Sequence, residues 1–415
     1  MSGIYIHIPF CVQKCNYCDF LSLPLMDNSG FVYPSLRVKR SNPEKVQTLD
    51  CFGENALAIT EGLCRLYTTA LLREIEDAKI STPISTIYIG GGTPTALPSH
   101  LLCKILDAVV RHCEEGFSPM KQSTPCTAPG LLRSARNDGP EVTVEANPGT
   151  LSREYLTALK AHGVNRLSMG LQTTKPHLLR AINRLHTMEQ FLENYHTARE
   201  LGFENINIDL MFALPGQTMQ DWRDTLREVI ALSPQHISAY SLTPAEGTPL
   251  WDALETGNVT LPGDETDRAM YHTARELLGD AGYTHYELSN FAKPGFESRH
   301  NVDCWRRVPY MAFGLGAHSF DGKTRRRNTE DMAEYLAGNH APIEIEHLSE
   351  ADHLSETMIL GLRLTAGIPE ENIPQIFVPQ VAELTAKGLL ARQNGHVCLT
   401  PKGMDLANQV FEMFM

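Results

Sequence analysis

Residues 4–20, IYIHIPFCVQKCNYCDF, combine a short apolar run with three closely spaced cysteines. The apolar run predicts a strand over residues 5–8 that Pro9 ends, because proline lacks the backbone N–H that a strand needs. Cys11, Cys15 and Cys18 would then lie on the loop that leaves this strand. Three thiolates on one tight loop can each hold one iron of a [4Fe–4S] cluster, which leaves the fourth iron open to a small chelating molecule.

Two other interpretations of these cysteines stay open at this point. Spacings of four and three residues also mark one face of a helix, so the three could be small core residues. A zinc site formed by Cys11, Cys15, Cys18 and His7 is the second alternative. Zinc sites more often use two well-separated ligand pairs, and the sequence has no second pair of that kind. The spacing therefore favours the cluster.

Length and composition are typical of a globular protein. The chain has 415 residues, of which 42% are hydrophobic and 20% charged, so two domains and a large core are expected. A net charge of −13 argues against nucleic-acid binding, which needs a basic face. The sequence shows neither an apolar run of membrane-spanning length nor a signal-peptide pattern, so we expect a cytoplasmic protein. Ten cysteines in that reducing compartment indicate metal binding or free thiols, not disulfides.

Strand-like runs alternate with helical patterns through the first 245 residues. The predicted strands are residues 5–8, 86–89, 142–146, 166–169, 206–211 and 236–240, and the predicted helices between them are residues 63–78, 101–112, 153–162, 188–201 and 221–232. Parallel neighbouring strands need crossover connections, which helices provide. The pattern therefore predicts an α/β fold with a partial (β/α)6 barrel.

The rest of the chain divides into an extension and a C-terminal domain. We expect residues 1–245 to form the barrel, with surface insertions at about 22–60 and 117–140, which are rich in Pro, Ser, Asn and Gly. Residues 246–345 form the extension, with a helix over 261–280, a strand over 283–288 and a loop-like region over 291–322. Residues 346–415 form an α+β, winged-helix-like domain, with helices over 350–362, near 370–373 and over 378–387, a hairpin over 389–399 and a last helix from residue 401 onward.

Polar and glycine residues are concentrated where the predicted strands end. They are Gly90 to Pro94 after the second strand, Glu145 and Asn147 at the third, Gln172 after the fourth, Asp209 at the fifth and Ser241 after the sixth. Because the carboxyl ends of parallel strands meet at one face, these residues predict a binding site there. The set suits a zwitterionic nucleoside: Thr93 offers a hydroxyl, Glu145 and Asp209 can accept hydrogen bonds from ribose or an amine, and Arg184 can pair with a carboxylate.

Several motifs together resemble the oxygen-independent coproporphyrinogen oxidase family of radical S-adenosylmethionine (SAM) proteins. They are YIHIPFC at residues 5–11, the three-cysteine loop, GGGTPT at 90–95, EANP at 145–148, SMGLQ at 168–172, DLM at 209–211 with LPGQ at 214–217, and YELSN at 286–290. The resemblance covers nearly the whole chain apart from the two insertions. It implies a [4Fe–4S] cluster on Cys11, Cys15 and Cys18, with SAM on the open iron. It also implies a SAM site lined by Tyr5, Gly91, Gly92, Thr93, Glu145, Gln172, Arg184 and Asp209.

Within that family the chain is most similar to the HemW-type branch, regarded as haem chaperones. The true oxidases carry a further cysteine where this chain has Phe20. The branch shows an H-N-x-x-Y-W haem motif, which His300, Asn301 and Trp305 match while Cys304 replaces the tyrosine. A histidine on a loop can ligate haem iron while Trp305 packs on the macrocycle.

The resemblance implies a protein that binds haem and transfers it to an acceptor protein, without oxidase activity. The acceptor could be a membrane protein that is contacted transiently, and the chain itself would be a monomer or a weak dimer. The alternative function is an oxidase that decarboxylates coproporphyrinogen III. No catalytic residue is assigned from the sequence, and whether the protein is an enzyme stays open.

Overall fold

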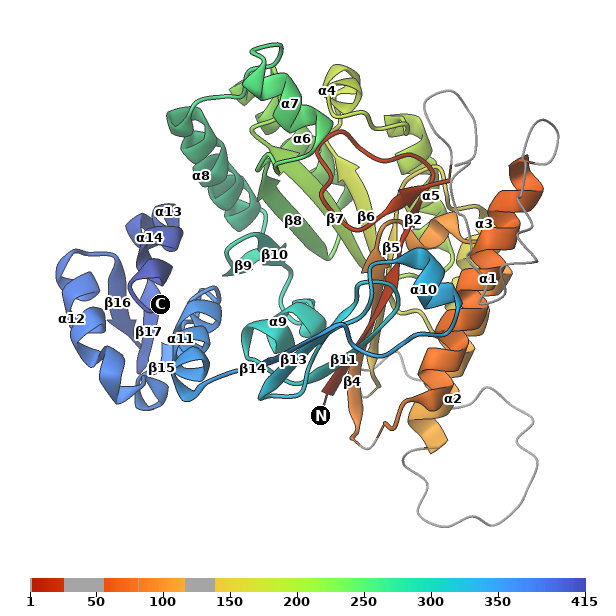
Figure 1. Ribbon diagram of the computed structural model, residues 1–415. Coiled ribbons are helices and arrows are strands. Elements are labelled where there is room, and N and C mark those ends of the chain that lie inside the picture. The colour runs from red at the N-terminus through yellow and green to blue at the C-terminus, as the bar shows by residue number, and fades with distance from the viewer. Residues whose placement is uncertain (1, 26–55, 81, 116–138) are drawn as a thin grey trace.

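The computed structural model of the chain describes residues 2–25, 56–80, 82–115 and 139–415 (Figure 1). Most of the two predicted insertions, with Cys51 and Cys126, therefore lies outside the described residues. Two elements lie at the edges of the first predicted insertion. Leu23–Pro24 form the short strand β3, and helix α1 already begins at Ala56.

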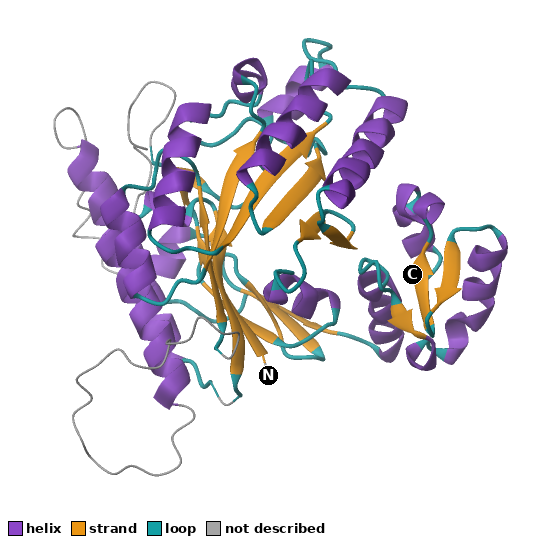
Figure 2. Cartoon of the chain, turned by 180° about the vertical axis from the view of Figure 1, so that it is seen from behind, coloured by secondary structure: helices purple, strands orange, loops and turns teal. Residues whose placement is uncertain are grey.

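Six parallel strands form the centre of the fold, as the alternating sequence pattern predicted. They are β1 (Ser2–Ile8), β4 (Ile84–Gly91), β5 (Glu141–Ala146), β6 (Arg166–Gln172), β7 (Asn205–Phe212) and β8 (His236–Ser241), adjacent in that order. The principal helices that follow them are α1 (Ala56–Asp77), α2 (Ser99–Glu115), α3 (Arg153–Ala161), α5 (Met188–Glu200), α6 (Met219–Leu232) and α8 (Asp264–Asp280). Figure 2 shows these helices on the outer side of the curved sheet. The partial (β/α)6 barrel is confirmed.

Side chains alternate along the barrel strands between an apolar outer face and a polar inner face. On β1, the fully buried Ile4, Ile6 and Ile8 belong to the main hydrophobic core. Tyr5 and His7 alternate with them and are joined by a hydrogen bond of 3.2 Å between the tyrosine hydroxyl and the Nδ1 atom of the histidine. Because side chains alternate with a period of two, each strand contributes apolar residues to the core under the outer helices and polar residues to the barrel interior.

The helix starts are fixed by local hydrogen bonds that the sequence encodes. Helix α5 begins with a capping box in which the Thr187 side chain accepts from Gln190 N and the Gln190 side chain accepts from Thr187 N. Helix α6 begins with the same arrangement between Thr218 and Asp221. Gly202, with φ of +82°, follows α5 and lets the chain turn toward β7. These caps keep the connections between strands and helices short.

The prediction of a loop-like region over residues 291–322 is wrong. This region contains β10 (Asn290–Ala292), helix α9 (Arg299–Trp305), β11 (Tyr310–Phe313) and β12 (His318–Phe320). The twelve-stranded sheet is completed by β9 (Thr284–Glu287), β13 (Thr324–Arg327) and β14 (Glu344–His347). Each of these elements is seven residues long or shorter, and glycines with positive φ, such as Gly314 and Gly322, separate several of them. Elements of that length give no sustained hydrophobic period.

The C-terminal domain has its own core and a three-stranded sheet. It consists of α11 (Glu350–Gly361), β15 (Ile368–Pro369), α12 (Val378–Ala386), β16 (Leu390–Gln393), β17 (His396–Leu399), α13 (Pro401–Asp405) and α14 (Ala407–Glu412). The predicted last helix is thus two helices that meet at Leu406, and the one predicted near residue 370 is a single 3-10 turn. Predicted helix 261–280 begins only at Asp264, after Pro262 and Gly263.

The C-terminal domain contacts the barrel through β9. Leu288 N donates to Arg363 O at 3.1 Å, and Thr365 N donates to Tyr286 O at 3.0 Å. Figure 1 shows this domain beside the end of the barrel where α9 lies. Within the described ranges, no helix is long and apolar enough to cross a bilayer.

Candidate functional site

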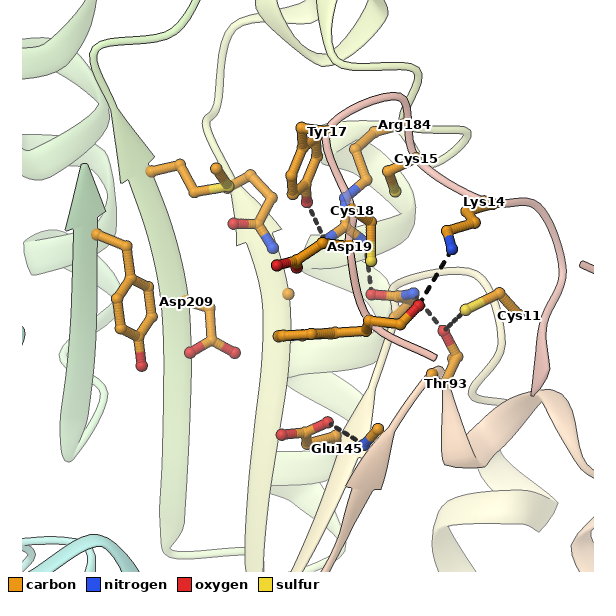
Figure 3. A pocket seen from close by; sticks show the side chains of 18 of the residues that line it. Cys11, Lys14, Cys15, Tyr17, Cys18, Asp19, Thr93, Glu145, Arg184 and Asp209 are labelled. Carbon is orange, nitrogen blue, oxygen red and sulfur yellow. Dashed lines mark hydrogen bonds between the residues drawn. The ribbon is translucent and has the colours of Figure 1, made fainter. Parts of the chain in front are cut away.

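A cavity of about 490 Å³ lies at the carboxyl ends of the barrel strands. It is lined by the three cysteines of the first loop and by residues on or directly after the barrel strands β4 to β8. Among the lining residues are Cys11, Cys15, Tyr17, Cys18, Tyr88, Gly91, Gly92, Thr93, Glu145, Asn147, Ser168, Gly170, Gln172, Arg184, Asp209 and Ser241. Figure 3 shows the cysteine loop on one side of the cavity, with Glu145 and Asp209 across from it. Parallel topology therefore brings distant sequence segments to one place.

The cysteine loop is anchored by backbone hydrogen bonds that join its two ends and by a side-chain hydrogen bond in its middle. Leu23 N donates to Pro9 O at 2.6 Å and Leu25 N to Cys11 O at 2.7 Å, which closes the loop into a short parallel pair of strands, β2 (Phe10–Cys11) and β3. The Asn16 side chain donates to Ala181 O at 2.9 Å. The loop is thus fixed in place by protein contacts alone.

The three thiols line the cavity without meeting at one point. Among the described residues, no three His, Cys, Asp or Glu side chains converge as the ligands of a single metal ion would. Burial raises the pKa of Cys11, against the effect of the hydroxyl of Thr93, and burial also raises the pKa of Cys18. Three thiols around an open space fit an iron–sulfur cluster better than a single metal ion, because each thiolate of a cluster site binds a different iron.

A glycine turn forms the wall next to Cys11. Gly92 N donates to Ile8 O at 2.8 Å and Thr93 N to Phe10 O at 2.6 Å, so the turn is bonded to the start of the cysteine loop. Gly91 has φ of +106°, and a Cβ atom there would lie 2.5 Å from the His7 ring. Only glycine fits this position without displacing the histidine. The Thr93 hydroxyl donates to Cys11 Sγ at 3.5 Å and accepts from Asn147 Nδ2 at 2.7 Å.

Arg184 lies beneath the cysteine loop with one nitrogen free. Its Nη1 donates to Asn147 Oδ1 at 2.6 Å and its Nη2 to the Tyr17 hydroxyl at 2.9 Å. The Nε atom is buried and has no partner. An unsatisfied buried donor on a cation fits an anionic group of a ligand, such as a carboxylate. Gly170 leaves room here, since a Cβ atom on it would lie 2.9 Å from Asn147 Oδ1.

Two carboxylates face the cavity from the far side. Glu145 accepts a hydrogen bond of 2.7 Å from the Tyr88 hydroxyl and one of 3.2 Å from Gly91 N. Burial raises the pKa of Glu145 to about 7. Asp209 accepts from the Ser168 hydroxyl at 3.0 Å and from Asn207 Nδ2 at 2.8 Å. Both carboxylates keep lone pairs that can accept from the hydroxyl or ammonium groups of a ligand.

Gln172 enters the cavity through an irregularity in its strand. The pairing of β6 with β7 shifts register between Gly170 and Gln172, as in a β-bulge. Gln172 has φ of +69°, which is unusual for a residue other than glycine. Bulges re-aim side chains and often occur beside functional sites.

The cavity contains seven of the eight residues predicted to line the SAM site. The exception is Tyr5, whose hydroxyl lies against His7 and whose ring stacks on that of Tyr88 with centroids 6.3 Å apart. Sequence reasoning missed the contributions of Tyr17, Tyr88 and Ser168. The last two lie two residues before Gly90 and Gly170 on the same face of their strands, so a period of two from the glycines would have found them.

The predicted haem residues lie elsewhere, on helix α9, and not on a loop as expected. His300 is 7% exposed; its Nδ1 atom lies 2.9 Å from the Thr86 hydroxyl, and its ring stacks on that of Tyr88 at 5.0 Å. Burial lowers the pKa of His300 to about 4. Trp305 faces the C-terminal domain instead, with its ring 4.3 Å from the guanidinium of Arg363. The two residues thus lie on a helix and not on a loop, and their side chains contact different parts of the protein.

The other two residues of that motif also lie on α9. Asn301 is half-buried, and its backbone N–H donates to the Ser298 side chain that caps the helix. Cys304 is half-buried, and burial raises the pKa of its thiol to about 11. Cys304 follows His300 by four residues and so shares its side of the helix.

The Radical SAM superfamily profile matches residues 5–229, and that of the HemN C-terminal domain matches residues 348–406. Among curated proteins, the chain is 35% identical to the protein named heme chaperone HemW of Bacillus subtilis, with 100% of this chain and 99% of that protein covered. It is 29% identical to the heme chaperone HemW of Escherichia coli over 100% and 98% of the two chains. It is 29% identical to the radical S-adenosyl methionine domain-containing protein 1, mitochondrial, of Danio rerio over 91% and 78%.

Among solved structures, the chain resembles coproporphyrinogen III oxidase (HemN) from Escherichia coli, described as a radical SAM enzyme. The TM-score is 0.73 at 21% identity, and the match covers 100% of this chain and 89% of that one. At this identity the likeness shows the fold alone.

Proposed function

Because this chain belongs to the HemW-type branch of the radical SAM superfamily, we propose that it is a haem chaperone that binds a [4Fe–4S] cluster, SAM and haem. It would transfer the haem to an acceptor protein in the cytoplasm, which could itself be a membrane protein, and it would act as a monomer or weak dimer. The single observation that carries the cofactor part is the cavity, where three thiols, a glycine turn, two carboxylates and a partly unpaired arginine surround one space. The domain boundaries at 245/246 and 345/346 are part of the same proposal.

Each group of the cavity has a role that follows from its chemistry. Cys11, Cys15 and Cys18 would hold three irons, and the carboxylate of SAM would occupy the free Nε side of Arg184. Glu145 and Asp209 would accept from the ammonium and hydroxyl groups of SAM. When bound and reduced, such a cluster supplies an electron to the sulfonium of SAM. The chain would contribute positioning, a polar lining and restricted access of water.

The haem part of the proposal is supported by the names of the full-length relatives and by the motif on α9. In the described conformation His300 is bonded to Thr86 and stacked on Tyr88. For its imidazole to ligate iron, α9 would have to move and release the ring. Haem binding is therefore proposed as an event that rearranges α9, with Cys304 as a candidate second ligand.

Anaerobic reconstitution with iron and sulfide, followed by haem titration, tests the proposal. We expect one chain to bind one haem, and His300→Ala to weaken this binding. His285→Ala is the matched control, because burial also lowers the pKa of His285 to about 4 and its ring stacks on Phe291, outside α9. Equal haem affinity of His300→Ala and wild type would remove His300 from the proposal.

The same preparation distinguishes the alternative function. Coproporphyrinogen III is added under reducing, anaerobic conditions with SAM, and its decarboxylation is followed by chromatography. A chaperone should yield no protoporphyrinogen, whereas steady conversion would show that the protein is the oxidase.

A further inference from the structure

A chain of hydrogen bonds crosses the barrel from the start of α9 to the cavity. Ser298 N lies 3.2 Å from the Tyr286 hydroxyl, which lies 2.8 Å from Nε2 of His236. Nδ1 of His236 lies 2.6 Å from Asn207 Oδ1, and Asn207 Nδ2 lies 2.8 Å from Asp209 Oδ1. All the links before Asp209 are buried, and His236 is fully enclosed. Of the residues in this chain, only Asp209 has a role in the proposed function.

The Asp209 carboxylate, at the end of this chain of hydrogen bonds, determines which atom donates in each of them. The Asp209 carboxylate can only accept, so the amide atom of Asn207 that faces it must be the NH2 group. The other amide atom is then the carbonyl oxygen, and Nδ1 of His236 must carry the proton that it accepts. Burial lowers the pKa of His236 well below its usual value, which keeps the ring neutral and its Nε2 free to accept. The Tyr286 hydroxyl therefore donates to Nε2 and accepts from Ser298 N.

Every hydrogen bond in the chain is donated in the direction of Asp209. The Asn207 side chain makes all four hydrogen bonds that its amide allows, and one of them is to Asp209. Its Nδ2 also donates to Ser168 Oγ at 2.7 Å, and its Oδ1 also accepts from Ser238 Oγ at 3.1 Å. The Ser168 hydroxyl in turn donates to the second oxygen of Asp209. An amide with four satisfied bonds cannot rotate without losing several of them. Each Asp209 oxygen thus has one lone pair fixed by the protein and another for the cavity.

We infer that His236 and Asn207 are positioning residues of the cavity, which orient the Asp209 carboxylate toward the hydroxyl or ammonium groups of a bound nucleoside. This inference rests on the proposed function for the identity of the nucleoside, SAM. His236 acts on Asp209 through Asn207. The Tyr286 hydroxyl also connects His236 to Ser298 at the start of α9. The cavity and α9 are therefore held by one continuous set of bonds.

Binding of SAM to the cluster-loaded protein tests the inference by calorimetric titration. His236→Phe removes the donor to Asn207 and should weaken SAM binding about fivefold to tenfold, the effect of one lost hydrogen bond. His236→Asn keeps an N–H near the position of Nδ1 and should restore most of the affinity. Tyr283→Phe is the matched control and should bind SAM within about twofold of wild type, because its hydroxyl donates to Pro234 O outside the chain of bonds.

A double-mutant cycle separates positioning from a general loss of structure. In an Asp209→Asn background, His236→Phe should cause no further loss of SAM affinity, because its effect passes through the carboxylate that is already gone. Additive losses in the double variant would overturn the inference. So would wild-type affinity in the single variant His236→Phe.

A spectroscopic measurement without SAM keeps this inference distinct from the proposed function. In protein with 15N-labelled histidine, one ring should show the neutral Nδ1–H tautomer at neutral pH, and its signal should vanish in His236→Phe. The Nε2–H tautomer for His236 would overturn the orientation deduced for Asn207 and Asp209. If wild type shows the Nδ1–H tautomer but binds no SAM, the proposed function fails while the orientation of Asp209 stands.

Discussion

Replacing Glu145 by glutamine tests how much the ionised carboxylate of this residue destabilises the folded protein when no ligand is bound. The pKa of Glu145 is about 7 in the folded protein because the side chain is largely enclosed, against about 4.3 for an unperturbed glutamate. Each pKa unit corresponds to 1.36 kcal/mol, so the ionised form costs at most about 4 kcal/mol of folding free energy. Water in the cavity reduces this figure.

The sign of the pH dependence follows from the raised pKa. Below about pH 4.3 the carboxyl is protonated in both the folded and the unfolded protein and contributes no penalty. As the pH rises to about 7, the unfolded chain loses its proton first, and the folded protein loses stability relative to it. Glu145→Gln cannot ionise. It should therefore be increasingly stable relative to wild type between about pH 4.5 and 7.5, and the difference should then level off.

The assay is urea unfolding of protein without cluster or SAM, for both chains at a series of pH values. Glutamine can accept from Gly91 N with its oxygen and donate to the Tyr88 hydroxyl from its NH2 group, so its hydrogen bonds are the same at all pH values. The slope with pH, not the absolute difference, therefore reports the charge. Glu76→Gln, on the exposed side of α1, controls for removing a surface carboxylate. Parallel pH profiles of wild type and Glu145→Gln would refute the reasoning.

Four further variants probe the site and helix α1. Tyr88→Phe removes the 2.7 Å donor to Glu145 and should lower the free energy of unfolding by about 1–2 kcal/mol above pH 7 and by less at pH 5, as urea unfolding would show. Arg184→Lys cannot serve both Asn147 and Tyr17 and should weaken SAM binding about tenfold by calorimetric titration. Gly170→Ala should also weaken SAM binding, because its Cβ would crowd Asn147. Gly62→Ala, whose added Cβ atom would meet no described residue within 4 Å, should stabilise α1 by about 0.5–1 kcal/mol, as urea unfolding would show.

The barrel could be predicted from the sequence because long elements carry a clear hydrophobic period. Helix α6 and strand β7, for example, are long enough for that period to be seen, and both were located within two residues. Helix α9 has seven residues, and its N-cap at Ser298 is the only local signal for it. Short elements of this kind are fixed by tertiary contacts, here the bonds of Glu141 to the N–H groups of Arg299 and His300.

The cavity was largely predictable because strand order converts position along the chain into position in space. Polar residues at the ends of successive parallel strands must lie together, which located Thr93, Glu145 and Asp209 without coordinates. The hydrogen bonds in the barrel interior could not be predicted from the sequence. The hydrogen bonds of Asn207 and His236 join strands that the sequence cannot place in register, so their partners appear only in the folded chain.

The position of the haem motif shows a second limit of prediction from sequence. His300, Asn301 and Trp305 lie close together in the sequence, but a helix turns His300 toward the barrel interior and Trp305 toward Arg363. A linear motif states which residues occur together. It does not state which of them face one ligand.

The most direct test of the account is the iron content and electron paramagnetic resonance spectrum of anaerobically reconstituted protein. We predict about four irons and four sulfides per chain, a reduced-state spectrum that shifts when SAM is added, and loss of both in Cys11→Ala, Cys15→Ala and Cys18→Ala. Cys64→Ala and Cys398→Ala, which remove buried thiols outside the cavity, should keep the cluster. Retention of a SAM-responsive cluster without any one of the three loop cysteines, or stoichiometric zinc in its place, would contradict the account.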